Sequence, residues 1–158
     1  MSEDREARNV GQKNLRKGRS SLENHIYHVT IVTSNKKKIF ADLVLGRLVV
    51  RSLIRLERTE RASTMAFVIM PDHMHWLFRL PRHSNLSSMV GAMKSQSSSL
   101  INRQLDVPGA NWQRGFCDRA LRRDEDIVQV ARYIVANPLQ AGLVSDIGEY
   151  PHWYSIWA

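Results

Sequence analysis

The sequence has a single cysteine, Cys117, among its 158 residues. One thiol excludes an internal disulfide bond and any zinc cluster built from several cysteines. No apolar run approaches the roughly 20 residues that a membrane-spanning helix requires, and the N-terminus lacks the apolar segment of a secretory signal. We therefore expect a protein with no membrane partner that works in the reducing cytoplasm.

Acidic residues are also scarce. The chain has 23 Lys and Arg against 15 Asp and Glu, which gives a formal net charge of +8. Such an excess favours a polyanionic partner, most simply nucleic acid. With 43% hydrophobic residues, the chain is long enough for one sizeable core and too short for two.

The first 24 residues contain almost nothing to bury. A basic cluster surrounds Gly18 in this segment and consists of Lys13, Arg16, Lys17 and Arg19. A segment with so few apolar residues has little driving force to fold alone. We predict that residues 1–24 form a basic arm that contacts DNA, with a solvated tail as the alternative, and that residues 25–158 form one domain.

Residues 67–80, FVIMPDHMHWLFRL, are the centre of the pattern. Two apolar runs joined by a Pro-Asp turn signal predict an antiparallel hairpin. Side chains alternate along the second run, so Trp76 and its neighbours at 74 and 78 point to one face, while His73 and His75 point to the other. Two imidazoles at this spacing can bind one divalent cation, and the alternative is that they make local hydrogen bonds only.

Strand alternation, with a repeat of two residues, and the helical repeat of 3.6 residues predict the other elements. In chain order they are a strand over 25–33, a helix over 42–58, the hairpin, a helix capped by Ser84 or Asn85 that reaches Ile101, a strand over 112–121 and a helix capped by Asp124. This order predicts an α+β fold, the ferredoxin-like split β-α-β antiparallel sheet, with an added C-terminal helix. In the first strand, His28 is predicted to be a cross-strand polar neighbour of the histidine pair rather than a third ligand.

The added helix is predicted to have an acidic first turn that contains Glu125 and Asp126. At 100° per residue, Tyr133 and Asn137 lie on one flank of its buried stripe, one turn apart. We expect this flank to meet the histidine face of the sheet.

Four arginines occupy the polar side of the predicted helix over residues 42–58. They are Arg47, Arg51, Arg55 and Arg58. A solvated helix face is the plainest interpretation, and contact with phosphate groups is the alternative.

Together the site residues suit phosphoryl transfer. Two strand imidazoles and one carboxamide offer two nitrogens and one oxygen to a divalent cation, and Tyr133 faces the same place. A cation on a non-bridging phosphate oxygen withdraws charge and holds the phosphorus in line with the phenol oxygen. Attack by the phenol would give a covalent phosphotyrosine.

Four segments connect the sequence with a known family. They are YHVTIVT (27–33), MPDHMHWL (70–77), WQRGFCDRALR (112–122) and ARYIVANPLQAGLV (131–144). With these segments in this order, the sequence resembles the HUH single-tyrosine transposases of the bacterial insertion-sequence type, and within them the REP-associated tyrosine transposases. The resemblance covers about residues 25–157.

This resemblance assigns a role to each site residue. It implies that His73 and His75 are the HUH metal ligands, that Asn137 is a third ligand, and that Tyr133 is the nucleophile. The implied cofactor is Mg²⁺ or Mn²⁺.

The resemblance also implies a reaction and a partner. Members of the family cleave single-stranded DNA, leave a 5′-phosphotyrosine and a free 3′-hydroxyl, and reverse the step to rejoin strands. The REP-associated branch acts at repetitive extragenic palindromes that fold into hairpins, and the arm segment NLRKGRSS (14–21) is similar to its basic N-terminal segment. Relatives include monomers and homodimers that exchange the tyrosine helix, and the sequence leaves both states open.

Two other functions remain open at this point. A non-catalytic nucleic-acid-binding module on a ferredoxin-like sheet would bind through the arm and the arginine-rich helix face. A zinc hydrolase would use His73 and His75 with Asp72 or Asp118 as a further ligand or base. A covalent DNA adduct that is lost when the Tyr133 hydroxyl is removed would favour the nicking enzyme over the binding module. Tightly held zinc would favour the hydrolase.

Overall fold

The computed structural model describes residues 25–60, 62–122 and 125–158. Its elements are β1 (Ile26–Val32), η1 (Ser34–Lys36), η2 (Ile39–Ala41), α2 (Leu43–Thr59), β2 (Ser63–Ile69), β3 (His73–Arg79), α3 (Leu86–Leu105), β4 (Cys117–Ala120), α4 (Ile127–Val135), α5 (Asn137–Gln140), η3 (Ile147–Glu149) and β5 (Trp153–Ser155). The predicted arm residues Lys13, Arg16, Lys17 and Arg19 lie outside the described residues. Among the helices in the described ranges, none combines the length and the apolar character needed to cross a membrane.

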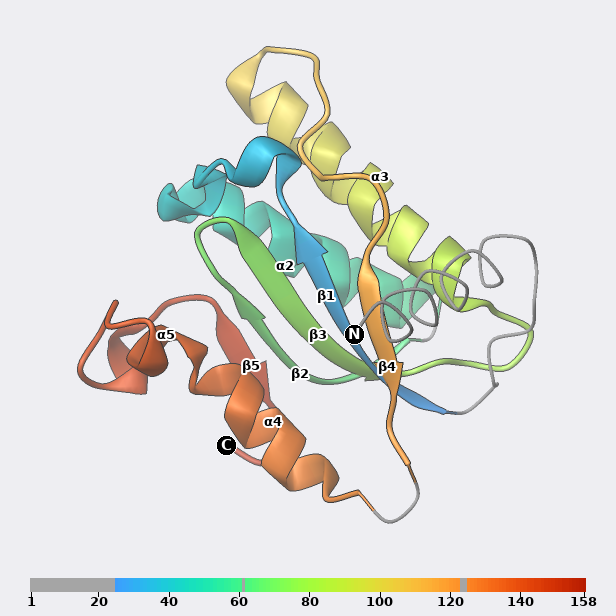
Figure 1. The fold of residues 1–158 in the computed structure, drawn as a ribbon. Coiled ribbons are helices and arrows are strands. Elements are labelled where there is room, and N and C mark those ends of the chain that lie inside the picture. Colours follow the sequence, from blue (N-terminus) through green and yellow to red (C-terminus); the bar gives the residue numbers. More distant parts are fainter. Residues whose placement is uncertain (1–24, 61, 123–124) are drawn as a thin grey trace, which may run out of the picture.

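The five strands form one antiparallel sheet in the order β4-β1-β3-β2-β5 (Figure 1). The first four strands and the helices α2 and α3 have the ferredoxin-like order, which confirms the predicted α+β fold. β5 extends the sheet beyond β2 and was not predicted. The hairpin of β2 and β3 closes where the N–H of Met70 donates to the carbonyl oxygen of His73 at 2.8 Å.

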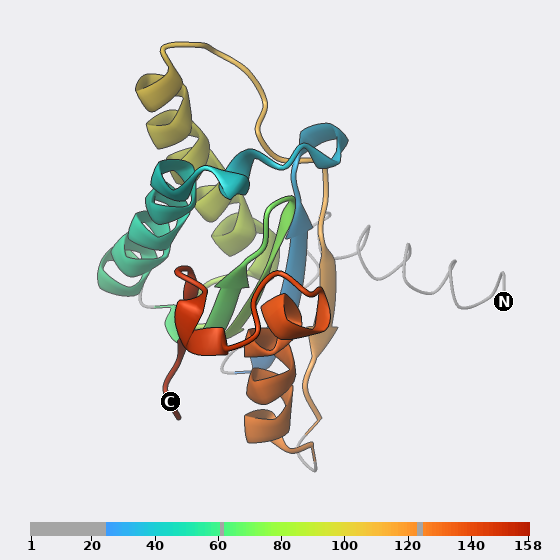
Figure 2. The ribbon, with the colours of Figure 1, turned by 90° about the vertical axis from the view of Figure 1, so that its left-hand side faces the viewer.

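The two faces of the sheet are covered by different helices (Figure 2). The core beneath α2 and α3 takes from the two central strands the side chains of Tyr27, Val29, Ile31, Met74, Trp76 and Phe78. On the opposite face, α4 packs Ala131 and Ile134 against Val68 and Leu77. The face that carries the histidines is therefore also the face that α4 approaches, as the alternation along β3 predicts.

The strand predicted over 112–121 is shorter in the structure. Only Cys117–Ala120 pairs as β4, and Trp112 makes an isolated bridge. Gly115 has a φ of 77°, in the left-handed region that a strand does not use. In addition, the ammonium group of Lys94 binds two carbonyl oxygens of this segment, at 2.9 and 2.6 Å. The prediction was wrong for 112–116 because these carbonyls bind an ammonium group instead of a neighbouring strand.

The helix that carries Tyr133 begins two residues later than predicted. Its N-cap is Asp126, whose carboxylate accepts from the N–H groups of Val128 at 3.0 Å and Gln129 at 3.3 Å. Asp124 lies outside the described residues, and Glu125 precedes the helix. The predicted acidic first turn is absent because the aspartate that would fill it is used as the cap.

Gly46 in α2 is expected to be intolerant of even one added methyl group. A Cβ atom at this position would lie 2.5 Å from Cδ2 and 2.6 Å from Nε2 of the buried His152. We expect Gly46→Ala to lower the free energy of unfolding by about 1–3 kcal/mol through overpacking, measured by urea denaturation. Gly91 in α3 is the matched control, because an added Cβ meets nothing within 4 Å there. Gly91→Ala is expected to raise stability by up to about 1 kcal/mol, and an equal loss in both variants would contradict the steric explanation.

Candidate active site

Three histidines share the α4 face of the sheet. His73 and His75 are two positions apart on β3, and the ring centroids are 5.1 Å apart in an edge-on arrangement. His28 of the neighbouring strand β1 lies 5.1 Å from His75, centroid to centroid. We call these three residues the histidine group.

Hydrogen-bonding contacts engage Nδ1 of both His73 and His75. Nδ1 of His73 lies 2.7 Å from a carboxylate oxygen of Asp72, so this nitrogen must donate. Nδ1 of His75 lies 3.0 Å from Nε2 of His28 and 3.1 Å from the hydroxyl of Thr30. His28 is thus a cross-strand polar neighbour, as predicted. When both Nδ1 atoms carry the proton, both Nε2 atoms present a lone pair, and neither has a hydrogen-bond partner among the described residues.

The surroundings of His28 and His75 disfavour the charged form of both rings. Burial lowers the pKa of His75 to about 3, and the proximity of His28 and His73 acts in the same direction. Burial also lowers the pKa of His28, with a further decrease from the charge of Arg119 and an opposing effect from Glu125. A neutral imidazole is the form that binds a metal ion, so His75 is ready for this role at neutral pH.

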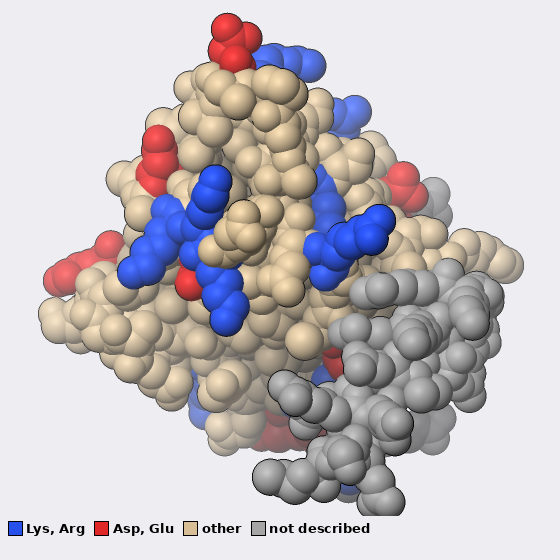
Figure 3. All heavy atoms as spheres, turned by 45° about the horizontal axis from the view of Figure 1, so that its top comes forward, with Lys and Arg blue, Asp and Glu red and all other residues tan. Residues whose placement is uncertain are grey.

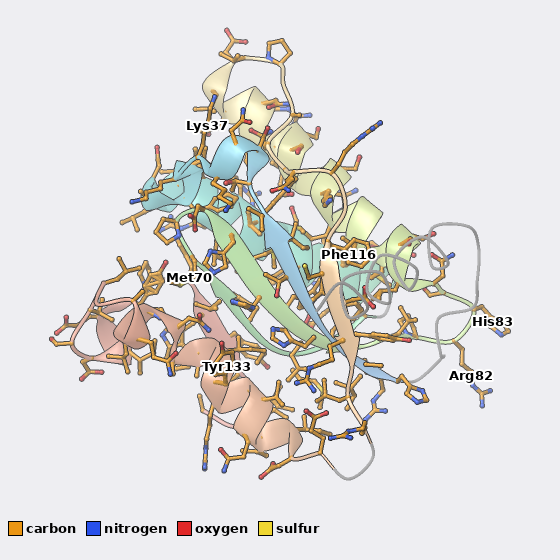
Figure 4. All side chains as sticks on the ribbon, in the orientation of Figure 1. Lys37, Met70, Arg82, His83, Phe116 and Tyr133 are labelled. Carbon is orange, nitrogen blue, oxygen red and sulfur yellow. The ribbon has the colours of Figure 1, made fainter. Side chains whose placement is uncertain are left out.

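The packing of α4 brings Tyr133 to the histidine group. Ala131 and Ile134 are buried against the sheet, which leaves Tyr133 on the adjacent flank with 54% of its surface exposed (Figure 4). Tyr133 and His28 line one cavity of about 400 Å³, and the other lining residues are Arg119, Glu125, Asp126, Gln129 and Val130. The helix flank thus meets the histidine face at Tyr133 and His28, and His28 is hydrogen-bonded to His75, whereas His73, His75 and Asn137 are not among the described residues that line this cavity.

Asn137 lies beyond the end of α4 and not within the same helix, contrary to the prediction. Pro138 has no N–H for the carbonyl of Ile134, so the regular helix ends. The carboxamide nitrogen of Asn137 replaces the lost donor and lies 2.9 Å from the carbonyl oxygen of Ile134 and 3.1 Å from that of Tyr133. The carboxamide oxygen has no hydrogen-bond partner within the described chain.

The available donors fit a divalent cation. Two Nε2 lone pairs come from the strand, and Asn137 retains one oxygen that no described residue engages. The carboxamide oxygen is the donor type that Mg²⁺ and Mn²⁺ prefer, and the imidazole nitrogens are donors for transition-metal ions.

The donors do not fit the zinc hydrolase. No three His, Cys, Asp or Glu side chains in the described ranges are placed to hold one metal ion. Asp72 is already bonded to the ring of His73, and Asp118 pairs in register with Val29, whose side chain is in the core beneath α2 and α3. Asp118 therefore faces away from the histidines, and the zinc hydrolase has no third ligand of these types among the described residues.

Sequence reasoning missed Arg119 and Glu125. Arg119 lies directly across from His28 in the pairing of β4 with β1, and it forms an ion pair with Glu125. Both side chains line the cavity of Tyr133. In the sequence, alternation along residues 117–120 indicates that 117 and 119 share one face and 118 and 120 the other. Only the strand register shows that the face of Arg119 is the histidine face.

Known proteins resemble the chain in sequence over much of its length. The family model described as Transposase IS200 like matches residues 21–137, a range that contains the histidine group, Tyr133 and Asn137. A Haemophilus influenzae Rd protein classed among the REP-associated tyrosine transposases is 30% identical over 100 residues, which is 57% of each chain. The REP-associated tyrosine transposase of Escherichia coli K12 is 27% identical over 101 residues, or 63% of this chain and 58% of that protein. The chain thus matches less than two thirds of the length of these relatives.

The fold has a close counterpart among solved structures. A REP-associated tyrosine transposase bound to a REP hairpin superposes with a TM-score of 0.72 over 85% of this chain and 79% of that chain, at 22% identity. This likeness establishes the shared fold, whereas the family assignment rests on the sequence. Since the family model matches well over half of the chain, the protein belongs to the IS200-like transposase family.

Proposed function

We propose that this protein is a transposase that nicks and rejoins single-stranded DNA at hairpin sequences through a phosphotyrosine on Tyr133. One observation carries the proposal: Tyr133 lines a cavity with His28, and His28 is bonded to His75, whose Nε2 remains free. Tyr133 is therefore connected through His28 to the candidate ligand His75, although the two residues come from separate elements, α4 and β3. The REP hairpin bound to the solved relative supports a hairpin-bearing DNA as the partner.

The proposed reaction balances without an external energy source. The hydroxyl oxygen of Tyr133 attacks a backbone phosphorus and forms a new O–P bond, while the bond from phosphorus to the 3′ oxygen breaks. The phenol loses its proton and the departing 3′ oxygen gains one. The 5′ side remains on Tyr133 as a phosphodiester, so attack by a 3′-hydroxyl reverses the step and rejoins DNA.

His73, His75 and Asn137 would hold the divalent cation, Mg²⁺ or Mn²⁺. When bound, such an ion supplies Lewis acidity at a phosphate oxygen and charge compensation for the phosphorane-like transition state. Asp72 fixes the ring of His73, and His28 with Thr30 fixes the ring of His75. These bonds orient both Nε2 atoms before substrate arrives, which limits the entropy lost on binding.

Basic surfaces provide the attraction for DNA. Lys and Arg side chains gather in groups on the face seen in Figure 3, with Asp and Glu mostly toward its edges. The arm residues Lys13, Arg16, Lys17 and Arg19 are proposed to add phosphate contacts. Charge of this kind gives affinity and register, whereas hairpin selection requires contacts of other kinds.

A groove between α2 and α3 is a further proposed phosphate-binding surface. It has a volume of about 620 Å³, and its arginines are Arg51, Arg55, Arg58 and Arg103. Its other lining residues are hydroxyl, amide and apolar side chains, without Asp or Glu in the described part of the chain. None of these four arginines forms an ion pair with a described residue. For Arg51, Arg55 and Arg58 of α2, phosphate contact is therefore favoured over a solvated helix face, whereas Arg47 does not line the groove.

Removing two groove arginines is expected to reduce the salt dependence of DNA binding. For Arg51→Gln combined with Arg55→Gln, the slope of log Kd against log salt concentration should decrease by about 2, because each phosphate contact contributes about 0.9. Fluorescence anisotropy with a labelled hairpin at several salt concentrations measures this slope. Arg47→Gln is the control, since Arg47 is exposed on the same helix but does not line the groove. An unchanged slope in the double variant would remove the groove from the proposed interface.

A covalent adduct assay tests the proposed reaction. The protein is incubated with a hairpin-bearing single-stranded oligonucleotide and Mn²⁺, and the products are separated under denaturing conditions. Label at the 3′ end is expected to move with the protein, while label at the 5′ end is expected on a free fragment. Salt-sensitive binding without any adduct, unaffected by a chelator, would instead favour the non-catalytic binding module.

A further inference from the structure

One permanent positive charge lies among the described residues of the cavity that contains Tyr133. Among the described residues that line it, Arg119 is the only Lys or Arg. A DNA strand that approaches Tyr133 along this cavity brings its phosphate charge to Arg119. The charge of Arg119 is therefore available where such a phosphate would bind.

The sheet directs Arg119 into this position. Arg119 pairs with His28 across β4 and β1, and His28 pairs in turn with Leu77 of β3. Paired residues of an antiparallel sheet project to the same face, so Arg119 projects to the face of the histidine group. Because the residue is on a strand, its backbone position is fixed before any ligand arrives.

A carboxylate holds the guanidinium at the cavity wall. Arg119 donates to one carboxylate oxygen of Glu125, and the other oxygen accepts from the backbone N–H of Arg122 at 3.1 Å. The second acidic residue of the wall, Asp126, is engaged by two N–H groups at the start of α4. Both carboxylates are thus compensated, while the side chain of Arg119 is 51% exposed and most of its five N–H donors remain available.

We propose that Arg119 binds the non-bridging oxygens of the phosphodiester that Tyr133 attacks. Glu125 holds the guanidinium in place until the phosphate arrives. A planar guanidinium matches two phosphate oxygens with two parallel hydrogen bonds, and it can neutralise charge that increases as the new O–P bond forms. This inference rests on the proposed function, since it assigns a further catalytic residue to the same reaction.

The first test compares charged and uncharged phosphates. Arg119→Gln is expected to slow adduct formation on the order of 10²- to 10³-fold at saturating DNA, as removal of one oxyanion donor does elsewhere. With an uncharged methylphosphonate at the reacting position, the same substitution should cost less than about threefold, because there is less charge to compensate. Arg82→Gln is the control, since Arg82 is exposed and lies well away from Tyr133 in Figure 4. An equal loss on both substrates, or no loss on either, would overturn the assignment.

The second test does not depend on catalysis. In a Tyr133→Phe background, the affinity is measured for a set of hairpin-bearing oligonucleotides, each with one methylphosphonate beside the stem. At one position, the methylphosphonate is expected to weaken binding when Arg119 is present and to leave binding unchanged in the Arg119→Gln variant. The two proposals can fail separately. If wild type forms no adduct but one methylphosphonate weakens binding only when Arg119 is present, the proposed reaction is rejected and the phosphate contact of Arg119 is retained. If no methylphosphonate has an effect that depends on Arg119, the phosphate contact of Arg119 is rejected.

Discussion

Tyr133→Phe is expected to abolish the covalent protein–DNA adduct while leaving DNA affinity within about twofold of wild type. The substitution removes only the attacking oxygen, and the exposed ring makes little contribution to the core. Loss of a nucleophile typically costs on the order of 10³-fold or more in rate. Denaturing gel analysis of wild type and variant side by side, with anisotropy for affinity, measures both properties.

Tyr154→Phe is the matched control for this result. Tyr154 is also an exposed tyrosine, but it lies on β5 and stacks on Phe67, with ring centroids 5.9 Å apart. It does not line the cavity of Tyr133. Adduct formation in Tyr154→Phe should equal that of wild type. An undiminished adduct in Tyr133→Phe would assign the nucleophile to another residue and reject the central part of the proposal.

Replacing His73 and His75 together by alanine is expected to remove the response to Mn²⁺. Each ring offers one free Nε2, so the double variant loses two of the three proposed ligand atoms. Adduct formation should decrease by at least about 10²-fold, since even indirect damage to a metal site costs 10- to 100-fold. A second readout needs no reaction: Mn²⁺ at 100 times its Kd should stabilise wild type against unfolding by about 2.7 kcal/mol and leave the variant unaffected.

His83→Asn is the control for the histidine pair. His83 is exposed, lies outside the site and has a φ of 59°, a conformation that asparagine tolerates better than alanine. This variant should keep both the Mn²⁺ response and the adduct. If the double alanine variant still bound Mn²⁺ with unchanged affinity, the metal ligands would have to be sought elsewhere.

The central strands were predictable because their side chains alternate strictly. Local geometry alone places Met74, Trp76 and Phe78 on one face of β3 and the two histidines on the other. The apolar side chains on the buried face are numerous enough to fix the register of the strands. The segment 112–121 was harder to predict. Its continuation as a strand was prevented by an ammonium group from α3, which is a contact between residues about 20 positions apart.

The end of α4 was only partly predictable from the sequence. The restriction imposed by Pro138 is visible in the sequence, whereas the use of the Asn137 carboxamide to bind the freed carbonyl of Ile134 is visible only in the structure. The bond turns the carboxamide nitrogen toward the helix end and leaves the oxygen for other contacts. Placement of Asn137 on a continuous helix was therefore wrong, although its candidate role as an oxygen ligand stays a prediction.

Residue type and periodicity alone determined which side chains are available for chemistry: two alternate histidines on a strand and a tyrosine beside the buried stripe of a helix. They also determined which surface of each element is buried, because that depends only on a repeat of two or 3.6 residues. Only the tertiary structure decided that His28 and Thr30 orient the ring of His75, and that Arg119 and Glu125 stand beside Tyr133. These contacts depend on strand register and on how α4 crosses the sheet, which are set by the packing of residues far apart in the chain.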